Sequence, residues 1–380
     1  MPLLNIEQQA IQKAAQEFAQ GEFNKDLALV HERNHTFPSE LWKKACKLGF
    51  VGIHYPEEYG GQAYGVLENA LVTEAFCRQD SGLGIALSHG DSAAEMILRY
   101  GTKEQKEKYL TRITTGEAIS SGAFTEPDHG SDIRAADTTA IRQGEEYVVN
   151  GAKIFITNGP IADFFVVLCQ TNPTAQPTHR GQSIIIVEKG CPGFTVADVG
   201  EKMGTRMTPT GELSFNDVRV PLSNVVGEEG KGFYQALRVF EEIRIEIGAQ
   251  AIGIAQGAFD RALAYTKQRK QFGMPLGQFQ IIRHKLAEMA TKIETGRLIV
   301  YRAAMSIDEG VIEPMLTSMA KLYAAQVAVE VADDAIQLHG GYGYMLEYEV
   351  ERFYRDARLL KIYGGTQEIQ KNTIARGMVG

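Results

Sequence analysis

The sequence predicts an α+β fold in which a middle β segment separates two helical segments. Apolar residues recur at helical spacing through the first third of the chain. Short runs rich in β-branched and aromatic residues follow, and helical spacing returns after Pro221 and continues to the end. We therefore expect an N-terminal α domain at 1–118, a middle β domain at 119–225 and a C-terminal helical domain at 226–380.

Length and composition agree with several packed modules. The chain has 380 residues, of which 44% are hydrophobic and 23% charged, as in ordinary globular proteins. The net charge is −8 without a long run of Lys or Arg, which argues against a nucleic-acid or anionic-membrane partner. No apolar run approaches the roughly 20 residues of a bilayer span, so we expect no membrane span.

The four cysteines are widely spaced and form no CxxC pair, so the sequence indicates neither a zinc site nor a disulfide framework. We expect buried free thiols in a reducing cytosol and no metal. The N-terminus shows an amphipathic helical pattern instead of a targeting signal, which also favours a cytoplasmic protein.

The β segment is expected to form a compact, barrel-like antiparallel module with Asn150-Gly151 as a hairpin turn. A polar run after Gly365 is typical of the first turn of a last helix. The helical patterns of the C-terminal segment predict a four-helix bundle. They cover residues 231–269, 277–307, 311–338 and 346–362.

Five short motifs suggest a function when they are taken together. GAFTEPDHGSD at 122–132 is rich in small and hydroxyl residues, and Phe155-Ile156-Thr157 sets an aromatic ring beside a hydroxyl, which suits a flat ligand with a hydrogen-bonding edge. Each is unremarkable alone. With QRKQFGMPLGQFQ at 268–280, QLHGGYGY at 337–344 and IYGGTQE at 362–368, the set resembles the acyl-CoA dehydrogenase family along essentially the whole chain.

The resemblance implies FAD between the β domain and the helical bundles of two subunits. It also implies an acyl-CoA thioester substrate, an electron-transferring flavoprotein as electron acceptor, and a homotetramer built as a dimer of dimers. Phe155 stands where the family usually has tryptophan against the flavin, and Thr157 matches the hydroxyl that bonds the ring near N5. The other positions that match cofactor contacts are Phe124, Thr125, Gly130, Ser131, Arg269, Gln280, Gln337, Leu338, His339, Gly340, Gly341, Thr366, Gln367 and Glu368.

Substrate contacts are implied at a second set of positions. Ser131 matches a turn shared with the CoA arm, and Gly365 would let the thioester pass close by. Glu241, Glu242 and Arg244 stand where relatives contact CoA. From the residues alone, these three side chains could instead lie on a solvated face of a helix. That alternative suits one of the glutamates well and Arg244 poorly.

Both of the family's usual positions for a catalytic base lack a carboxylate. The position between the tyrosine and glycine of the last loop is Gly364, and the position before the arginine of the first C-terminal helix is Ile243. Removing a proton from the substrate requires a base within hydrogen-bond reach. Ordinary α,β-desaturation of a straight chain is therefore doubtful.

Asp91 is the predicted replacement base. If residues 81–101 form one helix, Asp91 interrupts an apolar stripe of Leu83, Leu87, Ala94 and Leu98. A carboxylate on an apolar face has a raised pKa, as a general base near neutrality requires. Ser92-x-x-Glu95 also matches a capping box, which would start a helix there and leave Asp91 in the preceding turn.

A base at the acyl end of the pocket suits a substrate whose α-carbon has no proton. Cyclohex-1-ene-1-carboxyl-CoA fits, because its C3 proton is acidified through the double bond and its C6 can give hydride to flavin N5. The chain thus resembles the alicyclic subgroup of the family, in which this 1,4-elimination gives cyclohexa-1,5-diene-1-carboxyl-CoA. Gly364 would then clear space for the ring.

Three other functions stay open. The first is a conventional dehydrogenase of saturated straight-chain, branched or cyclohexanecarboxyl-CoA that uses Asp91, Glu242 or Glu246. The second is a non-catalytic acyl-CoA-binding relative, and the third is a redox-neutral elimination that uses the flavin as a scaffold.

Overall fold

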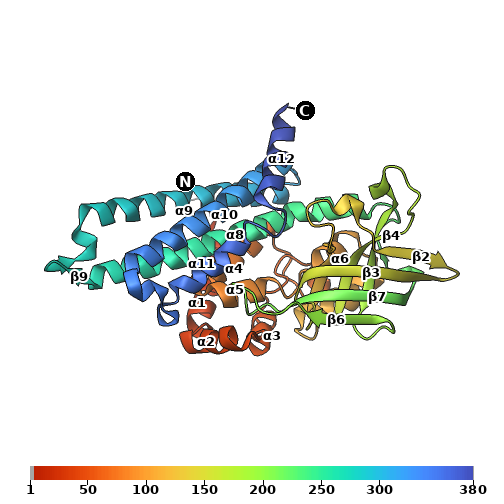
Figure 1. The fold of residues 1–380 in the computed structure, drawn as a ribbon, viewed down its shortest axis with the longest axis horizontal. Helices are drawn as coiled ribbons and strands as arrows, with labels where there is room; N and C mark the ends of the chain where they lie inside the picture. The colour runs from red at the N-terminus through yellow and green to blue at the C-terminus, as the bar shows by residue number, and fades with distance from the viewer. Residues whose placement is uncertain (1–3, 380) are drawn as a thin grey trace.

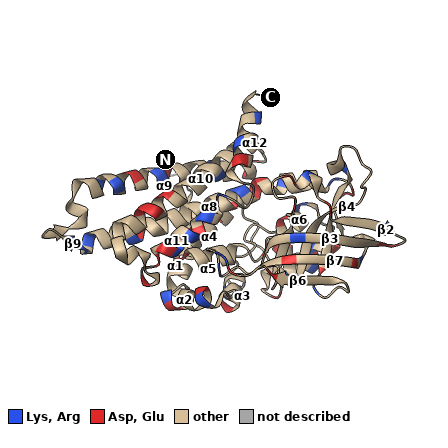
Figure 2. Cartoon of the chain, viewed as in Figure 1, with Lys and Arg blue, Asp and Glu red and all other residues tan. Residues whose placement is uncertain are grey.

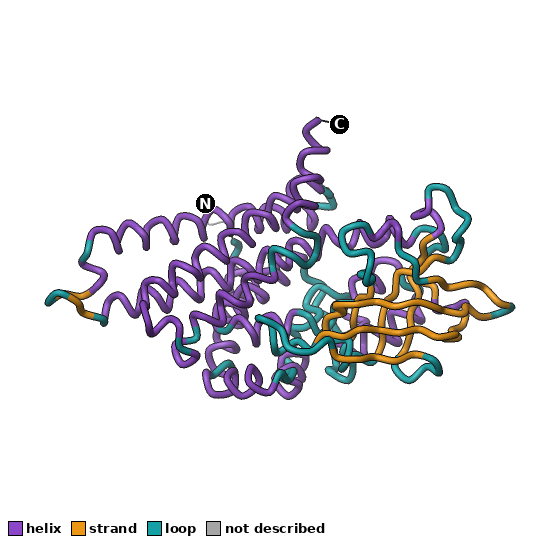
Figure 3. The backbone as a smooth tube through the Cα atoms, in the orientation of Figure 1, coloured by secondary structure: helices purple, strands orange, loops and turns teal. Residues whose placement is uncertain are grey.

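The computed structural model describes residues 4–379. Figure 1 shows long helices packed side by side, with the β-sheet at one end of the molecule and short helices next to it. Figure 3 shows that all but one small pair of strands lie at that end, so helices and strands are largely segregated and the α+β prediction is confirmed.

The N-terminal segment is helical. Its first helix begins where the Asn5 side chain accepts from the backbone N–H of Gln8, whose own side chain accepts in return from Asn5. Thr102 and Gln105 form the same arrangement at the start of α7. The helices are α1 (Ile6–Glu22), α2 (Lys25–Asn34), α3 (Ser39–Lys47), α4 (Val66–Gln79), α5 (Ser81–Ser88), α6 (Ala94–Tyr100) and α7 (Lys103–Thr114).

The prediction of one helix through residues 81–101 is wrong. The chain leaves helical geometry after Ser88 and re-enters it at Ala94, so Asp91 lies in a connecting segment and not on a helical stripe. This segment bonds to a strand instead: the Ser120 N–H donates to the Gly90 carbonyl at 2.8 Å, and Asp91 forms an isolated bridge with Ser120.

The alternative is right that a helix begins after Ser92 and that Asp91 lies in the segment before it, but the expected Ser92–Glu95 capping bonds do not form. The residue before α6 is Ala93, which makes no side-chain cap. The Ser92 hydroxyl donates instead to the Ser120 carbonyl at 3.2 Å, and the Glu95 side chain bonds His54. Contacts with the sheet have replaced the local capping bonds.

The middle segment forms one eight-stranded sheet. Most neighbours are antiparallel, as predicted, but β1 and β2 both pair with β4 in parallel, so the purely antiparallel prediction is wrong. The order β6-β7-β3-β2-β4-β5-β8 is an open path. The strands are β1 (Ser120–Ala123), β2 (Thr139–Gln143), β3 (Glu146–Thr157), β4 (Phe164–Gln170), β5 (Gln182–Glu188), β6 (Phe194–Asp198), β7 (Thr210–Pro221) and β8 (Val225–Val226).

Asn150-Gly151 is not a hairpin turn. Both residues lie inside the continuous strand β3, at a shift of register against β7. The Asn150 side chain bonds the backbone N–H of Asp217 on β7 at 2.9 Å, which holds the pair within the sheet. The actual turn between β2 and β3 includes Gly144, which has a φ of 64°.

The C-terminal helices lie close to the predicted ranges, and the predicted last helix is present. Figure 1 shows α12 rising from the packed bundle near the sheet end. The fourth predicted range was too long, because a short 3₁₀ turn occupies Leu346–Tyr348 before α11 begins. The helices are α8 (Gly232–Gln268), α9 (Gln280–Asp308), α10 (Pro314–His339), α11 (Val350–Leu359) and α12 (Gln367–Val379). A small antiparallel pair, β9 (Lys270–Gln271) and β10 (Met274–Pro275), joins α8 to α9.

Burial agrees with the sequence pattern. All four cysteines are free; three are buried and Cys191 is half-buried. Figure 2 shows positive and negative residues interspersed along the helices. Among residues 4–379, no helix is both long enough and apolar enough to cross a bilayer.

Gly257 allows α8 to approach two other helices closely. A Cβ at this position would lie 2.2 Å from the carbonyl oxygen of Arg78, which is in the last turn of α4. It would lie 2.5 Å from the Phe353 ring of α11. We expect Gly257→Ala to destabilise the protein by about 1–3 kcal/mol and to lower its thermal midpoint.

Gly21→Ala in α1 is the matched control for that change. Nothing lies within 4 Å of a Cβ at Gly21, so alanine should leave stability unchanged or raise it by about 0.5–1 kcal/mol through helix propensity. Equal effects of the two substitutions in thermal unfolding would contradict close packing at Gly257.

Candidate active site

Asp91 is half-buried, and its carboxylate is held by one tyrosine. The Tyr55 hydroxyl donates to Asp91 Oδ2 at 2.7 Å. Burial raises the pKa of Asp91 to about 6, although the Tyr55 hydrogen bond and nearby His54 act in the opposite direction. The carboxylate is therefore largely ionised at neutral pH, yet more basic than a solvated aspartate.

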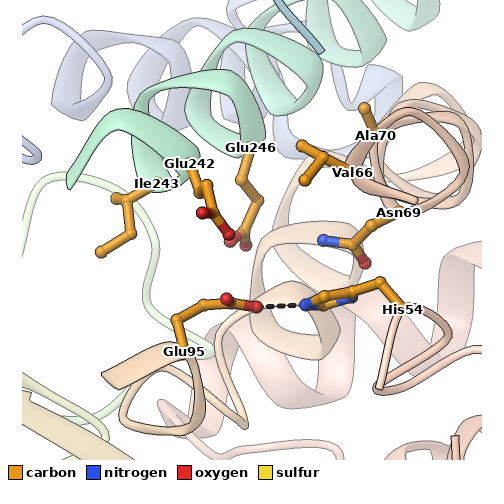
Figure 4. Close-up of a pocket in the computed structure, with 8 residues that line it drawn as sticks. All are labelled: His54, Val66, Asn69, Ala70, Glu95, Glu242, Ile243 and Glu246. Carbon is orange, nitrogen blue, oxygen red and sulfur yellow. Dashed lines mark hydrogen bonds and ion pairs between the residues drawn. The ribbon is translucent and has the colours of Figure 1, made fainter. Parts of the chain in front are cut away.

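A pocket beside this segment gathers three more carboxyl groups. Glu242 and Glu246 extend from α8 towards Glu95 of α6 and His54, and Ile243 lines the same pocket at its side (Figure 4). His54 Nε2 and Glu95 Oε1 are hydrogen-bonded to each other. Burial opposes ionisation of Glu95, but the His54 imidazole outweighs burial and lowers the pKa of Glu95.

The two glutamates of α8 have raised pKa values. Burial, together with the charge of Glu95, raises the pKa of Glu242, although Arg99 and Arg238 bond its two oxygens at 2.7 and 2.8 Å. Burial, followed by the charges of Asp91 and Glu95, raises the pKa of Glu246 well above its usual range. Glu246 is therefore harder to ionise than a solvated glutamate.

His89 does not supply a positive charge to Glu246. Its Nδ1 lies 3.9 Å from Glu246 Oε1, but burial lowers the pKa of His89 to about 4, so the imidazole is neutral. The amide of Gln250 lies 3.4 Å from the same glutamate oxygen. No positive charge from these two neighbours therefore offsets the burial of Glu246.

The last loop leaves no space for a side chain at Gly364. A Cβ there would lie 2.2 Å from Ile247 Cδ1, and the residue has a φ of 61°. Lys321 of α10 also holds this loop in place, because its Nζ donates a hydrogen bond to the Gly365 carbonyl at 2.6 Å. Burial lowers the pKa of Lys321 to about 7.

Glu241 and Arg244 are buried and bonded to each other at 2.6 Å. Glu241 also accepts from the Thr317 hydroxyl of α10, and Glu242 is buried as well. The alternative of a solvated helix face is therefore wrong for all three residues. Arg244 Nε has no partner among the described residues, so part of its bonding capacity is free.

The face predicted to bind the flavin presents an unusual aromatic side chain. The Phe155 side chain is 66% exposed at a φ of 59°, a backbone conformation that non-glycine residues rarely adopt. Thr157 follows on the same strand, and the Thr125 carbonyl bonds the neighbouring Ile154 N–H at 2.9 Å. Phe124 is half-buried and packs edge-on against Phe240. An exposed ring beside a hydroxyl fits a planar heterocycle with a polar edge.

The remaining predicted cofactor residues lie in two other places. Thr366, Gln367 and Glu368 open α12, while Gly130 and Ser131 lie exposed in the loop after β1. Arg269 lies 5.6 Å from the Tyr342 ring, and His339 stacks on Tyr265 at 4.3 Å. These contacts put Arg269, Gln280 and the segment 337–341 at the β9 end of the bundle, opposite the sheet (Figure 1).

One chain therefore does not bring Arg269 and Gln280 to Phe155. If both groups bind the same cofactor, a second subunit must supply one of them, as the resemblance implies.

An exposed ring beside a hydroxyl, on a sheet next to a bundle of long helices, fits a flavin-dependent oxidoreductase. Three family models match consecutive parts of the chain: acyl-CoA dehydrogenase N-terminal domain at 5–117, middle domain at 121–218 and C-terminal domain at 230–379. The chain belongs to the acyl-CoA dehydrogenase family, whose members depend on FAD.

Relatives with different substrates are about equally similar. A short-chain-specific acyl-CoA dehydrogenase of Clostridium acetobutylicum is 43% identical over 98% of both chains. A cyclohexane-1-carbonyl-CoA dehydrogenase of Geobacter metallireducens is 41% identical over 89% of this chain and 87% of its own. The structure of butyryl-CoA dehydrogenase from Megasphaera elsdenii superposes with a TM-score of 0.95 at 37% identity, covering 100% of both chains.

Sequence reasoning missed Tyr55, His54 and the pairing of Glu95. Tyr55 and His54 lie in a loop without periodicity, and Glu95 was explained by a local cap. The cluster consists of two acids on α8 that face a third acid on another helix. The residue spacing within any single segment does not indicate such a contact.

Introducing a base at position 364 tests the packing of the last loop. Gly364→Glu would set Cβ against Ile247 and place a side chain at positive φ, so we expect a loss of about 1–3 kcal/mol in stability. Adding Ile247→Ala makes room. The double variant should be more stable than the sum of the single effects by at least about 1 kcal/mol.

Denaturant unfolding of the wild type, both single variants and the double variant measures this coupling. Strictly additive effects would mean that Ile247 moves aside freely and that packing does not restrict position 364.

Proposed function

We propose that the protein dehydrogenates a cyclic acyl-CoA, cyclohex-1-ene-1-carboxyl-CoA, by 1,4-elimination to cyclohexa-1,5-diene-1-carboxyl-CoA, with Asp91 as base. The observation that carries this proposal is a half-buried aspartate of raised pKa in a member of the family whose two usual base positions are Gly364 and Ile243. The cyclohexane-1-carbonyl-CoA dehydrogenase relative supports an alicyclic substrate.

Among the four neighbouring carboxyl groups, Asp91 is best suited to accept a proton at neutral pH. Glu95 is ionised, but its lowered pKa makes it a weak base. Burial holds the pKa of Glu246 well above its usual range, and Glu242 is bonded by two arginines. Asp91, with a pKa of about 6, combines an ionised form with useful basicity.

The substrate chemistry follows from a base that is remote from the thioester. In the cyclohexenyl thioester the α-carbon bears no proton, so acidity is transmitted through the double bond to C3. Asp91 takes the C3 proton, and the electron pair moves into the ring as hydride leaves C6. When bound, FAD supplies the hydride acceptor for this oxidation.

The chain's own residues orient the reactants in this proposal. Phe155 and Thr157 present a flat face and a hydroxyl to the cofactor. Thr125, whose carbonyl bonds Ile154 N–H next to Phe155, belongs to the segment that also carries Phe124, Gly130 and Ser131. Arg269, Gln280 and 337–341 would come from a second subunit, with Thr366, Gln367 and Glu368 at the start of α12. Glu241 and Arg244 border the CoA arm, and Gly365 lets the thioester pass close by. The space expected beside Gly364 is taken by Ile247 Cδ1, so the ring and Gly364 meet only if that side chain moves. We further propose a homotetramer and electron transfer to an electron-transferring flavoprotein.

A conventional α,β-dehydrogenase is the second candidate. It is favoured by Glu242 and Glu246, which line the pocket beside Ile243, and by the short-chain and butyryl-CoA relatives. As a base Glu246 must be ionised, and burial together with the charges of Asp91 and Glu95 opposes its ionisation.

Replacing the proposed base tests the function directly. Asp91→Asn should slow flavin reduction by cyclohex-1-ene-1-carboxyl-CoA by on the order of 100-fold or more, because general-base catalysis contributes about that factor. Anaerobic stopped-flow mixing measures the rate, and saturated butyryl- and cyclohexanecarboxyl-CoA serve as comparison substrates.

Asp26→Asn, on the exposed face of α2, controls for the loss of a carboxylate. An Asp91→Asn rate within a few-fold of the wild type would exclude Asp91 as base. Faster reduction by butyryl-CoA would favour the conventional enzyme. Binding without reduction by any ester would indicate a non-catalytic relative, and diene formed without flavin reduction would indicate a redox-neutral elimination.

The pH dependence has a defined sign. Asp91 must be ionised to accept a proton, so the rate of flavin reduction should be constant above about pH 6 and fall roughly tenfold per pH unit below it. Asp91→Asn should lack this acid limb. If Asp91→Asn keeps the same fall in rate at low pH, that pH dependence belongs to another group.

A further inference from the structure

Tyr55 is the residue that fixes the Asp91 carboxylate. Its side chain is fully buried, with 0% exposure, and its hydroxyl donates to Asp91 Oδ2 at 2.7 Å. Within residues 4–379 this is the side-chain hydrogen bond that Asp91 receives. Oδ1 is thus left to accept a proton from elsewhere.

The loop around Tyr55 allows its ring little movement. The Tyr55 N–H donates to the Gly52 carbonyl at 2.9 Å, and its carbonyl accepts from Ala63 N–H at 2.8 Å. A Cβ at Gly52 would lie 2.6 Å from the Tyr55 ring, and one at Gly61 would lie 2.1 Å from its carbonyl oxygen. Two glycines therefore let the backbone close around this side chain.

Other charged and titratable groups also face Asp91. His54 packs edge-on against the Tyr55 ring at 4.7 Å and is bonded to Glu95. Glu95 and Glu246 carry or can carry negative charge that opposes ionisation of Asp91. Buried Cys46 is also close enough to interact with it. Of these groups, Tyr55 is the one that donates a hydrogen bond to the carboxylate itself.

We propose that Tyr55 is a positioning residue of the reaction: its hydroxyl fixes one oxygen of Asp91 and so directs the other towards the substrate proton. This inference rests on the proposed function, because it assigns a role to Tyr55 only if Asp91 is the base. A fixed carboxylate reacts without first being oriented, and a donor to Oδ2 favours the ionised form over the protonated one.

Removing the hydroxyl should therefore change both the rate and its pH dependence. In Tyr55→Phe, the acid limb of flavin reduction by cyclohex-1-ene-1-carboxyl-CoA should move to higher pH by on the order of one unit, because the ionised carboxylate loses its donor. The rate above the limb should fall by on the order of tenfold through loss of orientation. Affinity for the thioester should be unchanged.

Tyr109→Phe is the matched control. Tyr109 is also buried, and its hydroxyl donates to a carboxylate, Glu188 Oε1, at the same 2.7 Å. It belongs to α7 and faces the sheet, so its replacement should leave the acid limb in place. Thermal midpoint and FAD content of both variants identify any general loss of folding.

A second measurement keeps the inference testable if Tyr55→Phe folds poorly. Site-specific replacement of Tyr55 by 3-fluorotyrosine retains the ring and makes the hydroxyl a stronger donor, so the acid limb should move to lower pH. An acid limb at the wild-type pH in both variants would overturn the positioning role.

Failure of this inference is distinguishable from failure of the proposed function. If Asp91→Asn abolishes reduction but the Tyr55 variants keep the wild-type limb, only the role of Tyr55 is wrong. If Asp91→Asn retains the wild-type rate and limb, the base assignment is wrong, and the role of Tyr55 falls with it.

Discussion

The attachment of residues 89–93 to strand β1 is the constraint on which the site depends. The Gly90 carbonyl, the Ser92 hydroxyl and the Ala93 N–H all bond Ser120, so this short segment joins the helical domain to the sheet. Without these bonds the local sequence would be free to continue as helix, and Asp91 would point elsewhere. A functional side chain is thus positioned by contacts between domains.

Four acids in one low-dielectric region cannot all be ionised at neutral pH. Their hydrogen-bond partners give them different pKa values. His54 stabilises the ionised form of Glu95, two arginines bond Glu242, and the neutral amide of Gln250 lies next to Glu246. Each charge that is stabilised makes ionisation of the next acid less favourable. Asp91 receives a hydrogen bond from one neutral donor, the Tyr55 hydroxyl. Its pKa therefore lies between the lowered pKa of Glu95 and the strongly raised pKa of Glu246. In the proposed function, this arrangement leaves one base next to a pocket that is lined by three other carboxyl groups.

The sequence predicted what repeats along the chain and missed what depends on distant contacts. Helical periodicity identified α8, α9 and α10 to within a few residues, because their apolar faces are regular. It failed at Asp91 and at Asn150-Gly151, where local signals for a helix and a turn were overridden by bonds to β1 and β7. The sequence indicated Asp91 as a base because positions 364 and 243 hold Gly and Ile instead of acids. Its hydrogen-bond partner Tyr55 was identified only from the structure.

The glycine beside Asp91 also provides the protein with an internal optical probe. A Cβ at Gly90 would lie 2.4 Å from the ring of Trp42, so the indole rests directly on the backbone of the segment that holds Asp91. Trp42 is the single tryptophan of the chain. Its intrinsic fluorescence therefore reports on this one segment without any label, and changes in emission on adding a thioester register the local environment of Asp91.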